Sequence, residues 1–377
     1  MRKVILIGII LLTGFLIFGY FRVRSDLLED KQSINEQTST QQAQKNNPSI
    51  DTRESIFVPY WSVNDLNSEK LVQYEKVIYF GVSAKGEGID REESGFIALP
   101  GFVQFTQGQD TYLTLRMLDT ESNLKILEDP DLQEKIIADL IDITDQNRFD
   151  GVVLDLELSV LPFGDVKENI SMFVSKLSEE LHERDFTFLM TIYGDKYFRG
   201  RPYDINRLNN HVDEFMIMAY DFHKSYGEPG PNFPYSDNVE PPLSPLLGKE
   251  GNTRGGYGYD FKQMIEDFTK DVPTEKLTVV FGMFGYDWTL GKQGLPLKQA
   301  AALSLSAIRA RFYPECDLIS CAIQVDEKSK ETKISYIDDE GNKHQVWFED
   351  ENSAQKKIDY LNEQGIGKVA YWAWGYW

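Results

Sequence analysis

Residues 149–157 read Phe-Asp-Gly-Val-Val-Leu-Asp-Leu-Glu, a short apolar strand that ends in two acids, Asp155 and Glu157. Side chains two residues apart on a strand point to the same side, so both carboxyl groups should share one pocket while the alternating leucines face a hydrophobic layer. Two carboxylates held close repel each other, which raises one pKa and keeps an acid protonated near neutral pH. Such an acid could protonate a leaving oxygen, although acids at strand ends are more often helix caps or solvated charges.

Seven other short runs rich in strand-forming residues surround this one, and segments with helical periodicity separate them. The intervening segments 136–141 and 170–181, for example, carry their apolar residues on one helical face. Eight βα units predict the α/β class and a (β/α)8 TIM barrel, with catalytic groups at the C-terminal ends of the strands. We expect the strands at 56–60, 77–82, 112–117, 151–157, 186–192, 214–219, 277–284 and 368–374.

Two segments are too long for a minimal barrel. Residues 221–259, full of Pro, Gly and acids, should form a rim of the cleft. Residues 312–350 alternate around the turn sequence Asp-Asp-Glu-Gly-Asn at 338–342, which predicts a small β-hairpin insertion near the last helix. The only two cysteines, Cys316 and Cys321, could form a local disulfide or remain buried thiols, and the sequence leaves both open.

The N-terminus predicts a membrane anchor. Residues 4–21 carry no charge and lie between basic residues. As a helix this run would span about 27 Å, close to the hydrocarbon thickness. We therefore expect an anchor at 1–24, a flexible polar linker at 25–51 and a catalytic barrel at 52–377, in a single-pass protein with the barrel outside the cell. A cleaved signal peptide, which would leave the protein secreted, is the alternative.

Composition excludes some partners. The chain carries 60 acids against 39 bases, a formal net charge of −21, whereas nucleic-acid binding needs a basic surface. Four scattered His and two Cys show no metal-ligand spacing, and no phosphate-binding glycine loop is present, so we expect neither metal nor cofactor. We expect a monomer.

Several motifs resemble glycoside hydrolase family 18, the chitinase-like enzymes, in the correct order along residues 55–377. The segment 150–157 resembles the family's DGxDxDxE signature, with Val153 in place of the first Asp of the inner DxDxE. The segments 215–221, 281–288 and 369–375 resemble its sixth, seventh and eighth strands, although Phe284 stands where Tyr is usual. The short insertion makes the chain most similar to compact bacterial members of N-acetylglucosaminidase type that act on cell-wall or spore glycans.

The resemblance implies a retaining glycosidase that cleaves β-linked N-acetylglucosamine polymers, either chitin-like or peptidoglycan, through an oxazolinium intermediate. Glu157 would then be the general acid and base, and Asp155 would steady the substrate's acetamido group. Tyr220 would donate its hydroxyl to the acetamido oxygen. Substrate-binding residues would be Met218 and Asp221 beside that group, and Trp372 beneath it. Among other aromatics, Trp288, Trp61 and Tyr193 are candidate platforms on which a sugar ring could stack.

Val153 departs from the family pattern because valine cannot share a proton or hydrogen bond with Asp155. We expect Asp155 to depend more on Glu157 for its proton, which should alter the pH dependence of activity. A second hypothesis follows: a non-catalytic sugar-binding protein on the same barrel, with Val153 a sign of relaxed catalysis.

Overall fold

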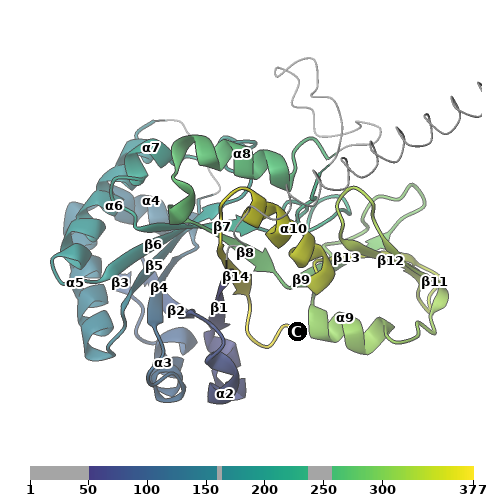
Figure 1. Ribbon diagram of the computed structural model, residues 1–377, viewed down its shortest axis with the longest axis horizontal. Coiled ribbons are helices and arrows are strands. Elements are labelled where there is room, and N and C mark those ends of the chain that lie inside the picture. The colour runs from purple at the N-terminus through teal and green to yellow at the C-terminus, as the bar shows by residue number, and fades with distance from the viewer. Residues whose placement is uncertain (1–50, 159–163, 237–256) are drawn as a thin grey trace, which may run out of the picture. The chain divides into compact units, whose positions relative to one another are not determined.

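The computed structural model describes residues 51–158, 164–236 and 257–377 (Figure 1). The predicted anchor, and the predicted linker except its last residue, lie outside these ranges. So do residues 237–256 of the predicted cleft rim. Within the three described ranges, no helix is both long enough and apolar enough to span a membrane.

Eight parallel strands form a closed barrel, which confirms the predicted architecture (Figure 1). The sheet closes because the first strand pairs in parallel with both its neighbours. Every predicted strand overlaps an observed one, with ends within three residues. In hydrogen-bonded order the strands are β1 (Arg53–Pro59), β14 (Lys368–Trp372), β8 (Leu277–Gly282), β7 (Glu214–Ala219), β6 (Thr187–Tyr193), β5 (Gly151–Leu156), β4 (Thr111–Met117) and β2 (Lys76–Lys85), and the two-residue β3 (Gly88–Ile89) pairs antiparallel with β2.

Most of the helices pack around the barrel and bury their apolar faces against it. The two faces expected from the sequence belong to the two longest helices and are buried; Leu140 and Phe173, for example, have no exposed surface. The helices are α2 (Ser68–Leu71), α3 (Ser94–Phe105), α4 (Thr120–Glu128), α5 (Pro130–Gln146), α6 (Val166–His182), α7 (Ile205–Leu208), α8 (Phe261–Asp271), α9 (Leu305–Phe312) and α10 (Glu351–Glu363), with 3-10 turns at η1 (Tyr60–Asp65) and η2 (Thr274–Lys276).

Strand alternation divides the hydrophobic core into two parts. On β5, Leu154 and Leu156 point outward into the layer between strands and helices. Val153 points inward and packs with residues of the other strands, such as Leu189 and Val280, inside the barrel. The interior is therefore filled by side chains, and Asp155 continues the inward-facing row toward the C-terminal end of the strand.

A five-stranded antiparallel sheet is inserted between β8 and α10. The insertion is therefore larger than the small β-hairpin predicted from the sequence. The predicted turn at 338–342 does join β12 to β13. Sequence reasoning missed the rest because the apolar run after Leu277 continues past Met283, where the chain leaves the barrel, and reads as one strand. The sheet order is β10 (Ala301–Ser304), β9 (Phe284–Leu290), β13 (Lys343–Phe348), β12 (Thr332–Ile337) and β11 (Ile319–Val325).

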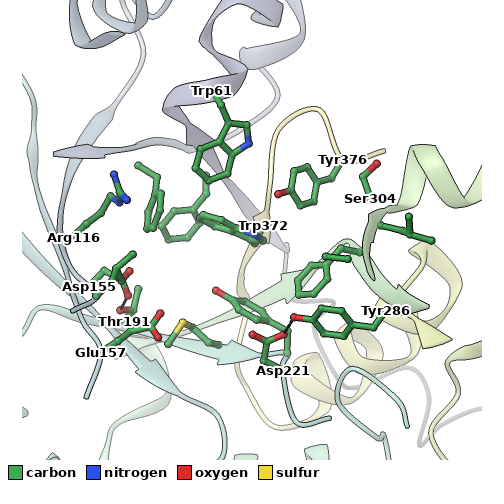
Figure 2. A pocket seen from close by; sticks show the side chains of 18 residues that line it. Trp61, Arg116, Asp155, Glu157, Thr191, Asp221, Tyr286, Ser304, Trp372 and Tyr376 are labelled. Carbon is green, nitrogen blue, oxygen red and sulfur yellow. Dashed lines mark hydrogen bonds between the residues drawn. The ribbon is translucent and has the colours of Figure 1, made fainter. Parts of the chain in front are cut away.

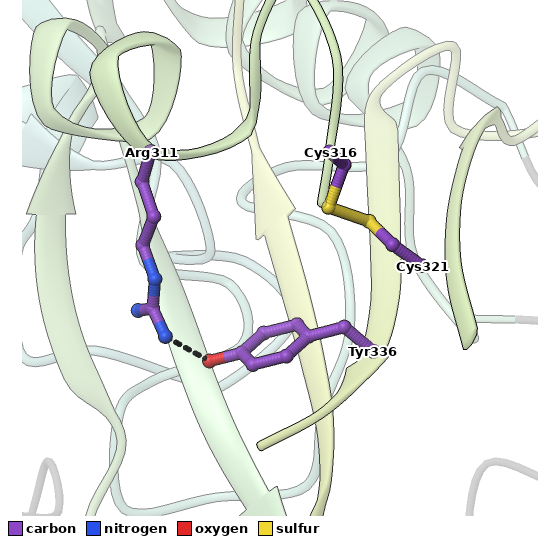
Figure 3. The surroundings of a disulfide bond; sticks show 4 residues. All are labelled: Arg311, Cys316, Cys321 and Tyr336. Carbon is purple, nitrogen blue, oxygen red and sulfur yellow. Dashed lines mark hydrogen bonds between the residues drawn. A yellow bond between two sulfur atoms is a disulfide. The ribbon is translucent and has the colours of Figure 1, made fainter. Parts of the chain in front are cut away.

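Cys316 and Cys321 form a disulfide between the segment after α9 and strand β11 (Figure 3). Nearby, Arg311 of α9 donates a hydrogen bond of 2.7 Å to the hydroxyl of Tyr336 on β12. These bonds join the helix of the insertion to its sheet.

Candidate active site

A cavity of about 490 Å³ lies at the C-terminal ends of the barrel strands (Figure 2). Its walls contain seven of the nine candidate residues named from the sequence, which are Trp61, Asp155, Glu157, Met218, Tyr220, Asp221 and Trp372. The barrel supplies most of the lining, and the insertion supplies Phe284, Tyr286 and residues 302–304. The strand-end argument therefore brought these residues to one cavity.

Asp155, on β5, is only 3% exposed. The hydroxyl of Thr191, on the neighbouring β6, donates to Asp155 Oδ1 at 2.5 Å. Burial, together with the negative charge of Glu157, raises the pKa of Asp155 to about 7. Asp155 therefore exchanges its proton near neutral pH.

Glu157 follows the last residue of β5 and is held on both its backbone and its side chain. Its amide donates to the carbonyl of Met117, and Asn123 donates to its carbonyl. The hydroxyl of Tyr193 donates to Glu157 Oε2 at 2.7 Å. The guanidinium of Arg201 lies 4.1 Å from the centre of the Tyr193 ring. Tyr193 therefore orients a carboxyl group, instead of presenting a ring face to a sugar.

Tyr220 and Asp221 follow β7, which is separated from β5 by one strand, β6. Burial raises the pKa of Tyr220 well above its ordinary value, and the nearby acids, Asp155 first among them, raise it further, so its hydroxyl keeps its proton. That hydroxyl makes no hydrogen bond to another residue of the described ranges and faces the cavity. Asp221 accepts a hydrogen bond of 2.7 Å from Tyr286 of the insertion, and its amide donates to Asn232.

Trp372, at the end of β14, lies in the middle of the cavity lining (Figure 2). Its ring contacts Phe57 and Phe80, with ring centres 5.8 and 4.6 Å away, and Trp61 at 6.3 Å. Trp61 is 48% exposed and lines the same cavity, so it can present a face to a ligand. The aromatic surface expected under a sugar is present.

Trp288 is not part of this surface, and its prediction as a sugar platform was wrong. Its side chain has no exposed area and does not line the cavity. Its indole nitrogen donates to the carbonyl of Gly227 at 3.0 Å, and its ring packs beside Tyr286. It belongs to the core of the inserted sheet.

Sequence reasoning did not identify Arg116, Thr191 and Tyr286. Arg116 is the register partner of Asp155 on β4, and its guanidinium lies 4.9 Å from the centre of the Phe80 ring. A charged residue within an otherwise apolar barrel strand was the available signal. Tyr286 could not be found without the fold, because the insertion brings it to the barrel.

Within the described ranges, no group of three or more His, Cys, Asp or Glu side chains could hold a metal ion. The chemistry that these residues can provide is proton transfer by two adjacent carboxyl groups, hydrogen bonding by a tyrosine, and stacking on tryptophan.

Comparisons with known proteins agree with this geometry. The sequence model described as "Glycosyl hydrolases family 18" matches residues 119–376. The cortical fragment-lytic enzyme of Bacillus anthracis is 24% identical over 311 residues, 79% of this chain and 64% of that protein. The chain spans 56 to 64% of the length of the first curated relatives it matches.

Solved structures show the same fold. The Bacillus cereus spore cortex-lytic enzyme SleL superposes with a TM-score of 0.64 at 21% identity, over 87% of this chain and 72% of that one. A chitinase from Chromobacterium violaceum superposes with a TM-score of 0.67 at 18% identity, over 86% and 95%. Because the family match covers more than half of the chain, and the barrel and its acids fit it, the chain belongs to glycosyl hydrolases family 18.

Proposed function

We propose that this protein is a retaining glycosidase that hydrolyses β-linked N-acetylglucosamine-containing polysaccharides. One observation carries the proposal: Asp155 and Glu157 lie in a single cavity with the hydroxyl of Tyr220 and the ring of Trp372. Family membership supports the same reading.

In the proposed mechanism Glu157 protonates the glycosidic oxygen, and the bond from that oxygen to the anomeric carbon breaks. The acetamido oxygen of the substrate attacks the anomeric carbon and closes an oxazolinium ring. Asp155 accepts a hydrogen bond from the acetamido N–H and stabilises the positive charge. Tyr220 donates to the acetamido oxygen while Trp372 packs beneath the methyl group. Glu157 then removes a proton from a water molecule as the water oxygen attacks the anomeric carbon; the bond from that carbon to the acetamido oxygen breaks, and the original configuration is restored.

We propose peptidoglycan as the preferred polymer and chitin as the competing one. The names of several relatives support peptidoglycan, because cortical fragment-lytic and spore cortex-lytic enzymes occur among them. Chitinases also share the fold. Product analysis on peptidoglycan and chitin side by side decides between them. Soluble fragments with N-acetylglucosamine at the reducing end, from peptidoglycan alone, are the expected result.

The decisive variant is Glu157→Gln. The amide keeps the volume and can still accept the hydrogen bond of Tyr193, but it cannot donate a proton to the leaving oxygen. We expect turnover to fall by about 10²-fold or more, with an unchanged unfolding temperature. Glu168→Gln, on the exposed side of α6, is the control and should keep full activity. Unchanged turnover in Glu157→Gln would disprove the proposed mechanism.

A sugar-binding protein without activity is the second candidate, and Val153 favours it because this position cannot pair with Asp155. A full-length protein that binds an N-acetylated glycan but releases no reducing ends between pH 4 and 9 would support this candidate.

We also propose that residues 4–21 hold the protein in the cell membrane, with the catalytic region outside and acting as a monomer. The uncharged run between basic residues supports this. Recovery of the intact chain in the membrane fraction, together with digestion of its catalytic region by protease added to whole cells, is the expected result. A shortened chain in the medium would favour a cleaved signal peptide.

A further inference from the structure

Val153 leaves a neighbouring hydroxyl without a partner. It lies inside the barrel with no exposed surface, and its register partner on β4 is Thr114. Residues paired in this way on parallel strands point to the same side. The hydroxyl oxygen of Thr114 is buried and has no hydrogen-bond partner among the described residues. On the β4 side, therefore, a donor is present, but the valine cannot accept from it.

On the β6 side a different hydroxyl reaches the acids. Thr191 lies two residues beyond Leu189, the register partner of Val153, and so faces the same interior. It is 5% exposed, and its hydroxyl oxygen lies 2.5 Å from Asp155 Oδ1 but 3.4 Å from the carbonyl of Leu154. A hydroxyl has one proton to donate, and the shorter contact receives it.

We propose that Thr191 is a positioning residue that takes the role Val153 cannot fill: it fixes the orientation of Asp155 and favours its carboxylate form, the form that accepts the acetamido N–H in the proposed mechanism. The inference rests on the proposed function, in which Glu157 must be the proton donor. In the family pattern, an acid at position 153 can hydrogen-bond with Asp155. Here the neutral side chain of Thr191, on the neighbouring strand, makes that hydrogen bond instead.

The groups around Asp155 explain why one hydroxyl can shift the balance between its protonated and carboxylate forms. Three titratable groups interact electrostatically with Asp155: Glu157 just after β5, Tyr220 just after β7, and Tyr203 in the segment before α7, whose hydroxyl donates to the carbonyl of Leu156. Burial and the charge of Glu157 raise the pKa of Asp155, whereas Thr191 and then Arg116 lower it. Arg116 also pairs with Glu93 at 3.5 Å. Thr191 is thus the one side chain of the described ranges that donates a hydrogen bond to Asp155.

The test compares Thr191→Val, Thr191→Ser and Thr114→Val in the full-length protein. Valine matches threonine in shape and removes only the hydroxyl. We expect Thr191→Val to move the acidic limb of the kcat/KM profile up by about one pH unit, since a hydrogen bond to a charged group contributes about that much. Turnover near pH 6 should fall about tenfold, and Thr191→Ser should restore both.

Thr114→Val is the matched control. It removes an equally buried threonine hydroxyl from the adjacent strand, and its pH profile should overlie that of the wild type. A Thr191→Val profile that also overlies the wild type would overturn the inference, and so would a serine variant as impaired as the valine variant.

A titration that needs no activity separates this inference from the proposed function. The carboxyl carbon of Asp155, labelled with ¹³C and assigned by its loss in Asp155→Asn, should titrate about one unit higher in Thr191→Val than in the wild type. If the wild type hydrolyses no glycan yet this shift occurs, the proposed function fails and the role of Thr191 stands. If hydrolysis depends on Glu157 but the titration is unmoved, the role of Thr191 fails alone.

Discussion

Two hydroxyl groups on alternate residues of β6 each donate a hydrogen bond to one of the two acids at the end of β5. Thr191 donates to Asp155, and Tyr193 donates to Glu157. The Tyr193 ring is 9% exposed and lies against Arg201, whose guanidinium is fixed by two hydrogen bonds to Asp195. The position of the proposed proton donor is thus set by a neighbouring strand as well as by its own.

Tyr193→Phe removes only the hydroxyl that holds Glu157 Oε2. We expect kcat to fall about tenfold with little change in KM, because a misplaced proton donor affects the transition state more than ground-state binding. Steady-state kinetics on a soluble oligosaccharide measure both constants. Tyr197→Phe is the control, since Tyr197 also donates to a carboxylate, that of Asp271, and does not line the cavity. Equal losses in the two variants would contradict a specific role for Tyr193.

At the scale of residues, the sequence predicted which acids line the cavity better than it predicted which aromatic residues do. The alternation of Asp155 and Glu157 after an apolar run places both on one side of a strand, whatever surrounds them. A tryptophan suits a sugar site and a hydrophobic core equally well, and only tertiary packing decides between them. Trp288 is therefore core, whereas Trp61 lies exposed in the cavity. Thr191 gave no signal, because a threonine is ordinary in a strand.

At the scale of elements, the barrel strands were predictable because both their faces are buried, which gives continuous apolar runs. The strands of the inserted sheet were harder to predict from the sequence. Its edge strand β11 is largely exposed, and β9 continues the apolar run of β8 with only Met283 between them. The hairpin of β12 and β13 was recognised from its turn sequence. Long-range pairing of β9 with β13 leaves no local signal.

The N-terminal ends of four barrel strands are joined by a buried polar network, at the end opposite the cavity. Glu214 of β7 accepts hydrogen bonds from Lys76, Lys368 and Thr278, which begin or lie near the start of β2, β14 and β8. Burial alone would raise the pKa of Glu214, but the two ammonium groups outweigh it and hold this pKa below its usual range. The charged form therefore stabilises the closed barrel.

Glu214→Gln should lower the free energy of unfolding at pH 7 by about 3 kcal/mol, because it leaves two partly buried ammonium groups without their counter-charge. Activity well below the unfolding temperature should be unchanged. Chemical denaturation and turnover of the same samples measure both effects. Glu168→Gln, which breaks an exposed ion pair with Arg207, should cost less than about 1 kcal/mol. A Glu214 variant that lost turnover before stability would show that this end of the barrel influences the active site.

At the scale of the whole molecule, acids that are costly to ionise set the pH dependence of stability. Glu331 and Glu349 share the single ammonium group of Lys357, and all three side chains are fully buried. Burial raises the pKa of Glu331 to about 8 and also raises that of Glu349, because one cation cannot neutralise two carboxylates there. Glu331 also accepts from the amides of Asn232 and Phe233, so this cluster links the insertion and α10 to the segment after β7.

The sign of the pH effect follows from these shifts. An acid whose pKa is raised on folding contributes stability fully below its unfolded pKa and loses that contribution as the pH rises through the folded pKa. For Glu331 this window runs from about 4.5 to about 8, and for Asp155 from about 3.8 to about 7. Glu214, whose pKa is lowered, has the opposite effect: its contribution to stability is lost as the pH falls below the usual pKa range of a glutamate. Thermal stability should therefore be highest near pH 5 and fall toward pH 8.

Glu349→Gln isolates the contribution of the cluster. The amide oxygen can still accept from Lys357, but the charge that lacks a partner is gone, so the variant should be more stable than the wild type at pH 8 and similar to it at pH 5. Unfolding temperatures between pH 5 and 9 provide the measurement. Glu351→Gln, at an exposed acid paired with Arg309, should leave the slope unchanged. If Glu349→Gln lowered the unfolding temperature equally at both pH values, the buried acids would be fully compensated, and the net charge of −21 would remain as the source of any loss at high pH.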